Sequence, residues 1–127
     1  MKGGTALGRV LGSGSAKSGF HHWWGQRVSA LALIPLALWF LFSLLALPGF
    51  DYASVTTWIA APWHAVLLCL LVGTACWHSQ LGVCVVIEDY VHTPGLKLFS
   101  LLLVQFAHVL VAATGLFAVL KIAFGAP

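Results

Sequence analysis

One histidine of this sequence lies where a polar side chain is costly. His78 falls inside a long apolar segment, about ten residues before the acidic pair Glu88 and Asp89. On a helix that crosses a bilayer, a rise of 1.5 Å per residue would put His78 ~15 Å below the membrane surface, near the midplane. An imidazole at that depth must hydrogen-bond a neighbouring helix or bind a metal, and haem iron is a metal that imidazole suits. Residue type alone leaves both interpretations open.

The predicted helix surrounds His78 with small residues and places one acid above it. At 100° per residue, Ala75 and Gly82 lie about 60° and 40° from His78 around the axis, and Asp89 lies about 20° away. Small residues beside a histidine let a flat macrocycle approach the backbone. They also let a second helix approach, so this feature is compatible with either role of His78.

Polar residues with possible binding roles also precede the first apolar segment and follow the second. Arg27 offers a fork of donors suited to a carboxylate, such as Asp89 or a haem propionate. Tyr90 offers a phenol that can hydrogen-bond a quinone carbonyl. An alternative is that Arg27, Asp89 and Tyr90 are ordinary residues of a membrane surface, with no ligand.

Two further histidines lie within or beside the apolar segments. His64 precedes His78 by about fourteen residues and about 40° of rotation, a spacing similar to that of diheme cytochromes b. His108 could match His78 in depth, but it shares a helical face with Ala112 and Gly115, so we expect it to hydrogen-bond a neighbouring helix. The other three, His21, His22 and His92, are expected at the membrane surface.

The composition requires a membrane. Of 127 residues, 61% are apolar and only 7% charged, a ratio that would leave a soluble protein of this size with a very large apolar surface. Three apolar spans, at about residues 28–47, 63–87 and 98–124, each meet the ~20 residues needed to cross the hydrocarbon core. The sequence therefore predicts an all-α membrane protein of three transmembrane helices in up-down-up order.

The basic residues predict how this protein lies in the membrane. Residues 1–19 form a Gly- and Ser-rich segment, expected to be a flexible cytoplasmic tail before a membrane domain of residues 20–127. Five of the six Lys and Arg residues lie in or near this tail and in the loop after the second span. The N-terminus is therefore expected on the cytoplasmic side. This distribution does not form a nucleic-acid surface, and the lack of an Arg-rich leader favours a bacterial inner membrane over a mitochondrial one.

Three cysteines, Cys69, Cys76 and Cys84, all fall within the second span. Their spacing on a helix puts their Cα atoms roughly 10–12 Å apart, beyond the reach of a disulfide. No Cys-x-x-Cys-His string is present, so covalent attachment of a c-type haem is excluded.

Two short segments resemble a known family. Residues 78–82 (HSQLG) and 86–91 (VIEDYV) resemble the second helix of a hydrophobic membrane anchor subunit of succinate dehydrogenase, complex II. Its pattern is a His, a Gly four residues on, and an Asp-Tyr pair at the end of the helix. Residues 19–30 (GFHHWWGQRVSA) resemble the start of that family's first helix, including a His six residues before the Arg. The resemblance covers about residues 18–124.

The resemblance implies roles for particular residues. His78 would be one axial ligand of a haem b, with the second histidine donated by the other anchor protein of the complex, the partner anchor subunit. His21 and Arg27 would lie near the haem propionates. Tyr90 and Asp89 would contribute to the ubiquinone site, with Tyr90 hydrogen-bonding a quinone carbonyl.

The resemblance also implies an assembly. A flavoprotein subunit would oxidise succinate and an iron–sulfur subunit would pass electrons to quinone, so this chain would carry no succinate chemistry itself. The partner anchor subunit would complete a helical bundle around the haem. Two alternatives remain: a structural membrane subunit without a cofactor, and a diheme cytochrome b-type subunit.

Overall fold

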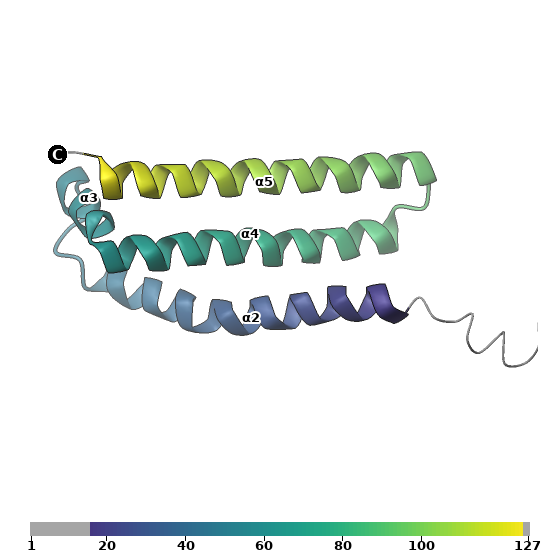
Figure 1. Ribbon diagram of the computed structural model, residues 1–127, viewed down its shortest axis with the longest axis horizontal. Helices are drawn as coiled ribbons and strands as arrows, with labels where there is room; N and C mark the ends of the chain where they lie inside the picture. The colour runs from purple at the N-terminus through teal and green to yellow at the C-terminus, as the bar shows by residue number, and fades with distance from the viewer. Residues whose placement is uncertain (1–15, 126–127) are drawn as a thin grey trace, which may run out of the picture.

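A computed structural model describes residues 16–125, and within this range the chain is helical apart from short connections (Figure 1). The helices are α2 (Ala16–Leu45), α3 (Tyr52–Ala60), α4 (Pro62–Tyr90) and α5 (Pro94–Phe124). Helices α2, α4 and α5 are long and apolar enough to cross a membrane. The prediction of an all-α protein with three membrane-spanning helices is confirmed.

Helix α2 begins earlier than the sequence analysis predicted. It starts at Ala16, although the apolar span was expected from residue 28 and the helical domain from residue 20. A helix does not end where the apolar residues end, because each added turn gains backbone hydrogen bonds until a helix breaker intervenes. The last four residues of the predicted tail are therefore helical, whereas residues 1–15, for which flexibility was predicted, lie outside the described residues.

A short helix, α3, occupies the connection that was expected to be a loop between the first two spans. Asp51 caps it: one carboxylate oxygen accepts a hydrogen bond from the Ser54 backbone N–H at 3.0 Å and the other from the Ser54 hydroxyl at 2.6 Å. The side-chain and backbone hydrogen bonds from Ser54 lower the pKa of Asp51. These bonds satisfy donors that would otherwise be left unpaired at the start of the helix.

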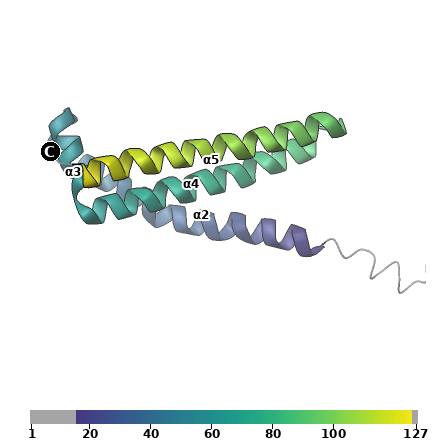
Figure 2. The same ribbon diagram turned by 45° about the horizontal axis from the view of Figure 1, so that its top comes forward.

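The three long helices form a row rather than a triangular bundle. Helix α4 lies in the middle and packs against α2 on one side and α5 on the other, as both views show (Figure 1, Figure 2). Within the described residues, no Cα atom of α2 lies within 8 Å of a Cα atom of α5. Helix α3 lies at one end of the row, which we call the α3 end, against α4 and α5. We call the opposite end, where α4 connects to α5, the loop end.

The row buries few side chains. The apolar core is a small cluster near the α3 end, made of Ala65 and Leu68 of α4 and Val119 of α5. Many large apolar side chains are exposed along all three long helices, as expected where lipid or another membrane protein covers the surface. A polar side chain is buried more deeply than this core: Ser29 of α2 is 1% exposed.

One glycine sets the distance between α4 and α5. A Cβ atom added at Gly115 would lie 2.9 Å from Cγ1 of Val72, closer than real side chains approach. The absence of a side chain at Gly115 therefore lets the two helices pack at their present separation.

Candidate functional site

The His78 side chain on α4 points at α2. Its Nδ1 atom lies 3.0 Å from the hydroxyl oxygen of Ser29, and its Nε2 atom lies 3.4 Å from the amide nitrogen of Gln26. The Ser29 hydroxyl lies 2.7 Å from the carbonyl oxygen of Gly25, to which it donates, and 3.1 Å from that of Gln26. The imidazole therefore meets a polar group at each ring nitrogen, both from the same face of α2.

Two glycines lie where α2 and α4 meet at this level, and only Gly25 is tightly packed. A Cβ atom at Gly25 would lie 3.3 Å from both the Trp77 ring and the Leu81 side chain of α4. A Cβ atom at Gly82 would lie 3.6 Å from the Gln26 amide nitrogen. The small residue predicted beside His78 at position 82 thus faces a neighbouring helix of the same chain.

The two contacts of His78 differ in quality. The distance from Nδ1 to Ser29 is that of an ordinary hydrogen bond, whereas 3.4 Å from Nε2 to Gln26 is longer than the usual 2.7–3.2 Å range. The Gln26 side-chain oxygen is buried and has no hydrogen-bond partner. Gln26 is therefore weakly held beside Nε2, and that nitrogen is the more available of the two for another ligand.

The polar residues expected near the membrane surface gather at the loop end. His21 and Arg27 are in the first half of α2, and Asp89 and Tyr90 are the last residues of α4 (Figure 1). All four side chains are exposed, Tyr90 to 80%. In the described part of the chain, Arg27 forms no ion pair with Asp89. Its guanidinium lies 5.6 Å from the centre of the Trp23 ring, a cation–π contact. The structure thus brings these residues to one end without joining them to His78.

His22 and His92 were expected at the membrane surface. His92 is exposed in the connection after α4, but His22 is half-buried, and its Nε2 atom is buried without a hydrogen-bond partner. His22 therefore differs from a solvated surface residue.

His108 makes the interhelical hydrogen bond that its position predicted. Its Nε2 atom lies 3.2 Å from the hydroxyl of Ser79 on α4, and its Nδ1 atom lies 2.8 Å from the carbonyl oxygen of Val104. His78 faces α2 while His108 contacts α4 from the other side. The structure does not bring these two histidines to a shared site.

His64 lies at the α3 end, away from His78. Its Nδ1 atom donates to the backbone carbonyl of Trp58 at 2.8 Å, and the two rings have centroids 5.1 Å apart. No other histidine contacts this ring among the described residues, and no cluster of three or more His, Cys, Asp or Glu side chains suited to a metal occurs there. Any metal at a histidine of this chain would need further ligands from elsewhere.

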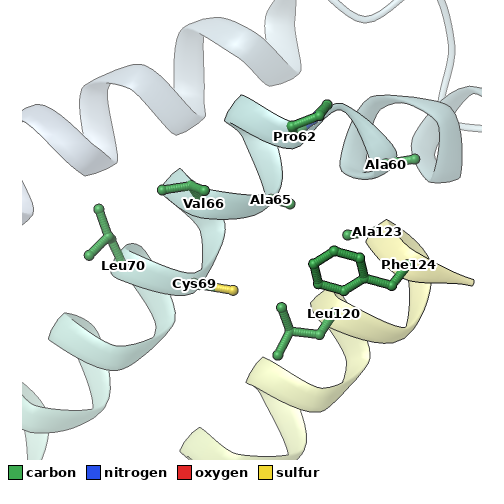
Figure 3. Close-up of a pocket in the computed structure, with 9 residues that line it drawn as sticks. All are labelled: Ala60, Pro62, Ala65, Val66, Cys69, Leu70, Leu120, Ala123 and Phe124. Carbon is green, nitrogen blue, oxygen red and sulfur yellow. The ribbon is translucent and has the colours of Figure 1, made fainter.

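A cavity is also present at the α3 end, between α4 and α5 (Figure 3). It has a volume of about 460 Å³, and its lining is almost entirely apolar, with side chains such as Val66, Leu70, Leu120 and Phe124. Cys69 is the one titratable group in its lining. The cavity lacks the converging polar groups of a reaction site.

Sequence reasoning did not single out Ser29 or Gln26, although both contact His78. A signal was available: His22, Gln26 and Ser29 are spaced by four and three residues, so they share one face of α2. Polar side chains in line on one face of an apolar helix indicate a buried contact with another helix.

Comparisons with known proteins agree with the fold. Residues 1–112 match the family described as succinate dehydrogenase/fumarate reductase transmembrane subunit. The chain is similar to succinate dehydrogenase hydrophobic membrane anchor subunits of three Rickettsia species. It is 37% identical to that of Rickettsia bellii, over 74% of this chain and 82% of the relative. It is 36% identical to that of Rickettsia conorii, over 76% of this chain and 78% of the relative. It is 34% identical to that of Rickettsia felis, over 76% of this chain and 81% of the relative.

The family match covers most of the chain, and each of these relatives aligns with about three quarters of it. The chain belongs to the succinate dehydrogenase/fumarate reductase transmembrane subunit family, as a hydrophobic membrane anchor subunit of succinate dehydrogenase.

Proposed function

We propose that this anchor subunit supplies His78 as an axial ligand of a haem b and forms part of the ubiquinone site of succinate dehydrogenase. The observation that carries the proposal is the His78 ring in the middle of α4. Its Nδ1 atom has a good hydrogen-bond partner, whereas its Nε2 atom has only a long contact to an amide. A ligating histidine needs this division, with one nitrogen held by the protein and the other available to the metal.

The residues around His78 fit a haem. Imidazole is a natural ligand for haem iron, and the half-buried ring lies on a helix whose other side chains are mostly apolar. The displaced Gln26 amide would lose only a 3.4 Å contact. When bound, the haem supplies one-electron transfer. The second axial histidine is proposed to come from the partner anchor subunit, since both ring nitrogens of His108 already have partners at Val104 and Ser79.

The loop end is proposed to contribute to ubiquinone binding. Tyr90 carries an exposed phenol that can donate a hydrogen bond to a quinone carbonyl, and the adjacent Asp89 is an exposed acid that can accept or release a proton. His21 and Arg27 lie at the same end of α2, and their positive or polar side chains suit the haem propionates.

The row of helices supports a larger assembly. Helix α4 packs against α2 and α5 along its length and against the short α3 at one end, and it still exposes apolar side chains elsewhere. We propose that the partner anchor subunit packs over one such face, completing a bundle. The flavoprotein and iron–sulfur subunits would dock at the loop end, on the cytoplasmic side of a bacterial inner membrane, with the N-terminus on that side.

One observation favours a second function, that of a structural anchor without a cofactor. Ser29 and Gln26 already give His78 a polar contact at each ring nitrogen, so the ring does not need a metal to be accommodated in lipid.

A spectrum of the purified complex separates these functions. We expect the native complex to show the sharp α-band of a bis-histidine haem b in a reduced-minus-oxidised spectrum, and His78→Ala to lose it. His64→Ala is the matched control, because it removes another α4 imidazole and should keep the band. A complex that retains the full band after His78→Ala, or a native complex with no haem, would refute the proposed ligand.

A further inference from the structure

We propose that Ser29 is a positioning residue for His78, which fixes the imidazole in the tautomer that offers Nε2 to the iron. The hydroxyl oxygen of Ser29 would accept a hydrogen bond from Nδ1–H of His78 across 3.0 Å. This inference rests on the proposed haem ligation. It assigns to α2 control over how strongly His78 would donate to the metal.

The first argument comes from the single hydrogen of the Ser29 hydroxyl. That hydrogen is directed to the backbone carbonyl of Gly25, at an oxygen–oxygen distance of 2.7 Å, the usual optimum for such a bond. A hydroxyl has one hydrogen and two lone pairs. With the hydrogen committed to Gly25, Ser29 presents a lone pair to His78, so Nδ1 of His78 must carry the proton.

The second argument comes from the other ring nitrogen. The group facing Nε2 of His78 is the amide nitrogen of Gln26, which is only a donor. A lone pair on Nε2 suits this donor, and in a neutral imidazole the proton is then on Nδ1. The long Gln26 contact is thus compatible with the tautomer that the Ser29 hydrogen bond requires.

The burial of Ser29 makes this hydrogen bond persistent. Ser29 is 1% exposed, and no other polar side chain among the described residues is buried, so water does not compete for its hydroxyl. Gly25, one turn earlier, allows α2 to approach Trp77 and Leu81 on either side of the His78 level. The hydroxyl is thus held between its own helix and the imidazole.

The hydrogen bond has a chemical consequence for a bound haem. A ligating imidazole that donates its other N–H to an acceptor is a more basic ligand, and its orientation is fixed. Greater basicity favours ferric over ferrous iron. Ser29 should therefore lower the reduction potential of the haem and keep His78 on the iron in both oxidation states.

The test measures the reduction potential and the carbon monoxide binding of the haem in the purified complex. It compares the native complex with the variants Ser29→Ala, Ser29→Thr and Ser43→Ala. We expect Ser29→Ala to raise the reduction potential of the haem, and with it the ferrous-to-ferric ratio at a fixed potential, because His78 becomes a less basic ligand when Nδ1–H loses its acceptor. A looser His78 should also let carbon monoxide bind the reduced haem. Ser29→Thr keeps the hydroxyl and should behave as the native complex.

Ser43→Ala is the matched control, because Ser43 lies on the same helix and donates to its own backbone at Phe40 but contacts no histidine. If Ser29→Ala fails to assemble, Ser29→Cys keeps a weaker acceptor and should give an intermediate shift. This inference alone would be overturned if the Ser29 variants kept the native reduction potential and bound no carbon monoxide, while the haem α-band still depended on His78. A band that survives His78→Ala would overturn the proposed haem ligation itself.

Discussion

Three consecutive residues in the middle of α4 reach both neighbouring helices. His78 contacts Ser29 on α2, Ser79 contacts His108 on α5, and the Gln80 amide donates to Gln105 on α5 at 3.4 Å. In hydrocarbon each of these polar groups requires a partner, so their pairing fixes how far α2 and α5 can slide along α4. The residues that set the helix register are therefore the same ones that surround the proposed ligand.

At the residue scale, the quinone role of Tyr90 predicts a selective loss. Tyr90→Phe removes one hydrogen bond to a quinone carbonyl, and we expect quinone reduction to fall about 10-fold, the effect of a bond worth roughly 1.4 kcal/mol. Succinate oxidation with an artificial acceptor should stay at the native rate.

The matched control for Tyr90→Phe is Tyr52→Phe, because Tyr52 is the other tyrosine of the chain and is similarly exposed, at the α3 end. Both assays use the purified complex. Equal quinone reductase rates in the two variants would contradict a role for Tyr90.

The sequence predicted part of the candidate site and not the rest, for a physical reason. His78 was identifiable because a lone imidazole deep in an apolar span needs a partner. Its partners Ser29 and Gln26 were not, because they depend on the register between two helices, which one sequence does not state. The haem and quinone roles of His78, His21, Arg27, Asp89 and Tyr90 stay predictions until they are measured.

At the scale of the elements, the close packing at Gly115 predicts a repairable defect. Gly115→Val places a branched side chain where a single Cβ would already meet Val72, and we expect destabilisation by about 1–3 kcal/mol, as for overpacked cores. The midpoint of thermal inactivation of the complex in detergent should fall accordingly.

The double variant Gly115→Val with Val72→Ala vacates the opposing methyl groups and should recover much of the lost stability. Equal midpoints for the single and the double variant would show that Val72 is not what limits the approach of α4 and α5.

The elements themselves were largely predictable, since an apolar run of 20 residues must be helical to satisfy its backbone inside a bilayer. All three long helices have the predicted order. What was missed is local: α3 is too short to leave a clear apolar pattern, although Asp51 followed three residues later by Ser54 marks its start. The early start of α2 was missed because its first turns lack the apolar residues by which the span was defined.

At the scale of the whole molecule, the distribution of basic residues predicts how the row is oriented. The loop end should face the cytoplasm and α3 the opposite side. Thr57 of α3 and Thr93 of the α4–α5 connection are both exposed and suit cysteine labelling.

A membrane-impermeant maleimide should label Thr57→Cys in intact cells and Thr93→Cys only in inverted vesicles. The native chain is the control for background from Cys69, Cys76 and Cys84, which lie along α4 inside its candidate span. Labelling in the reverse pattern would place Tyr90 and Asp89 on the wrong side for the proposed quinone site.

The central place of α4 in the row has a consequence for biosynthesis. The Ser29 hydroxyl bonds its own helix, so α2 can leave the translocon with this group satisfied. Gln80 has its hydrogen bond only through α5, which is made last. A nascent chain that stops before α5 therefore presents to the lipid the Gln80 amide without its partner, and the Ser79 hydroxyl without His108, polar groups that membrane quality control can recognise inside the bilayer.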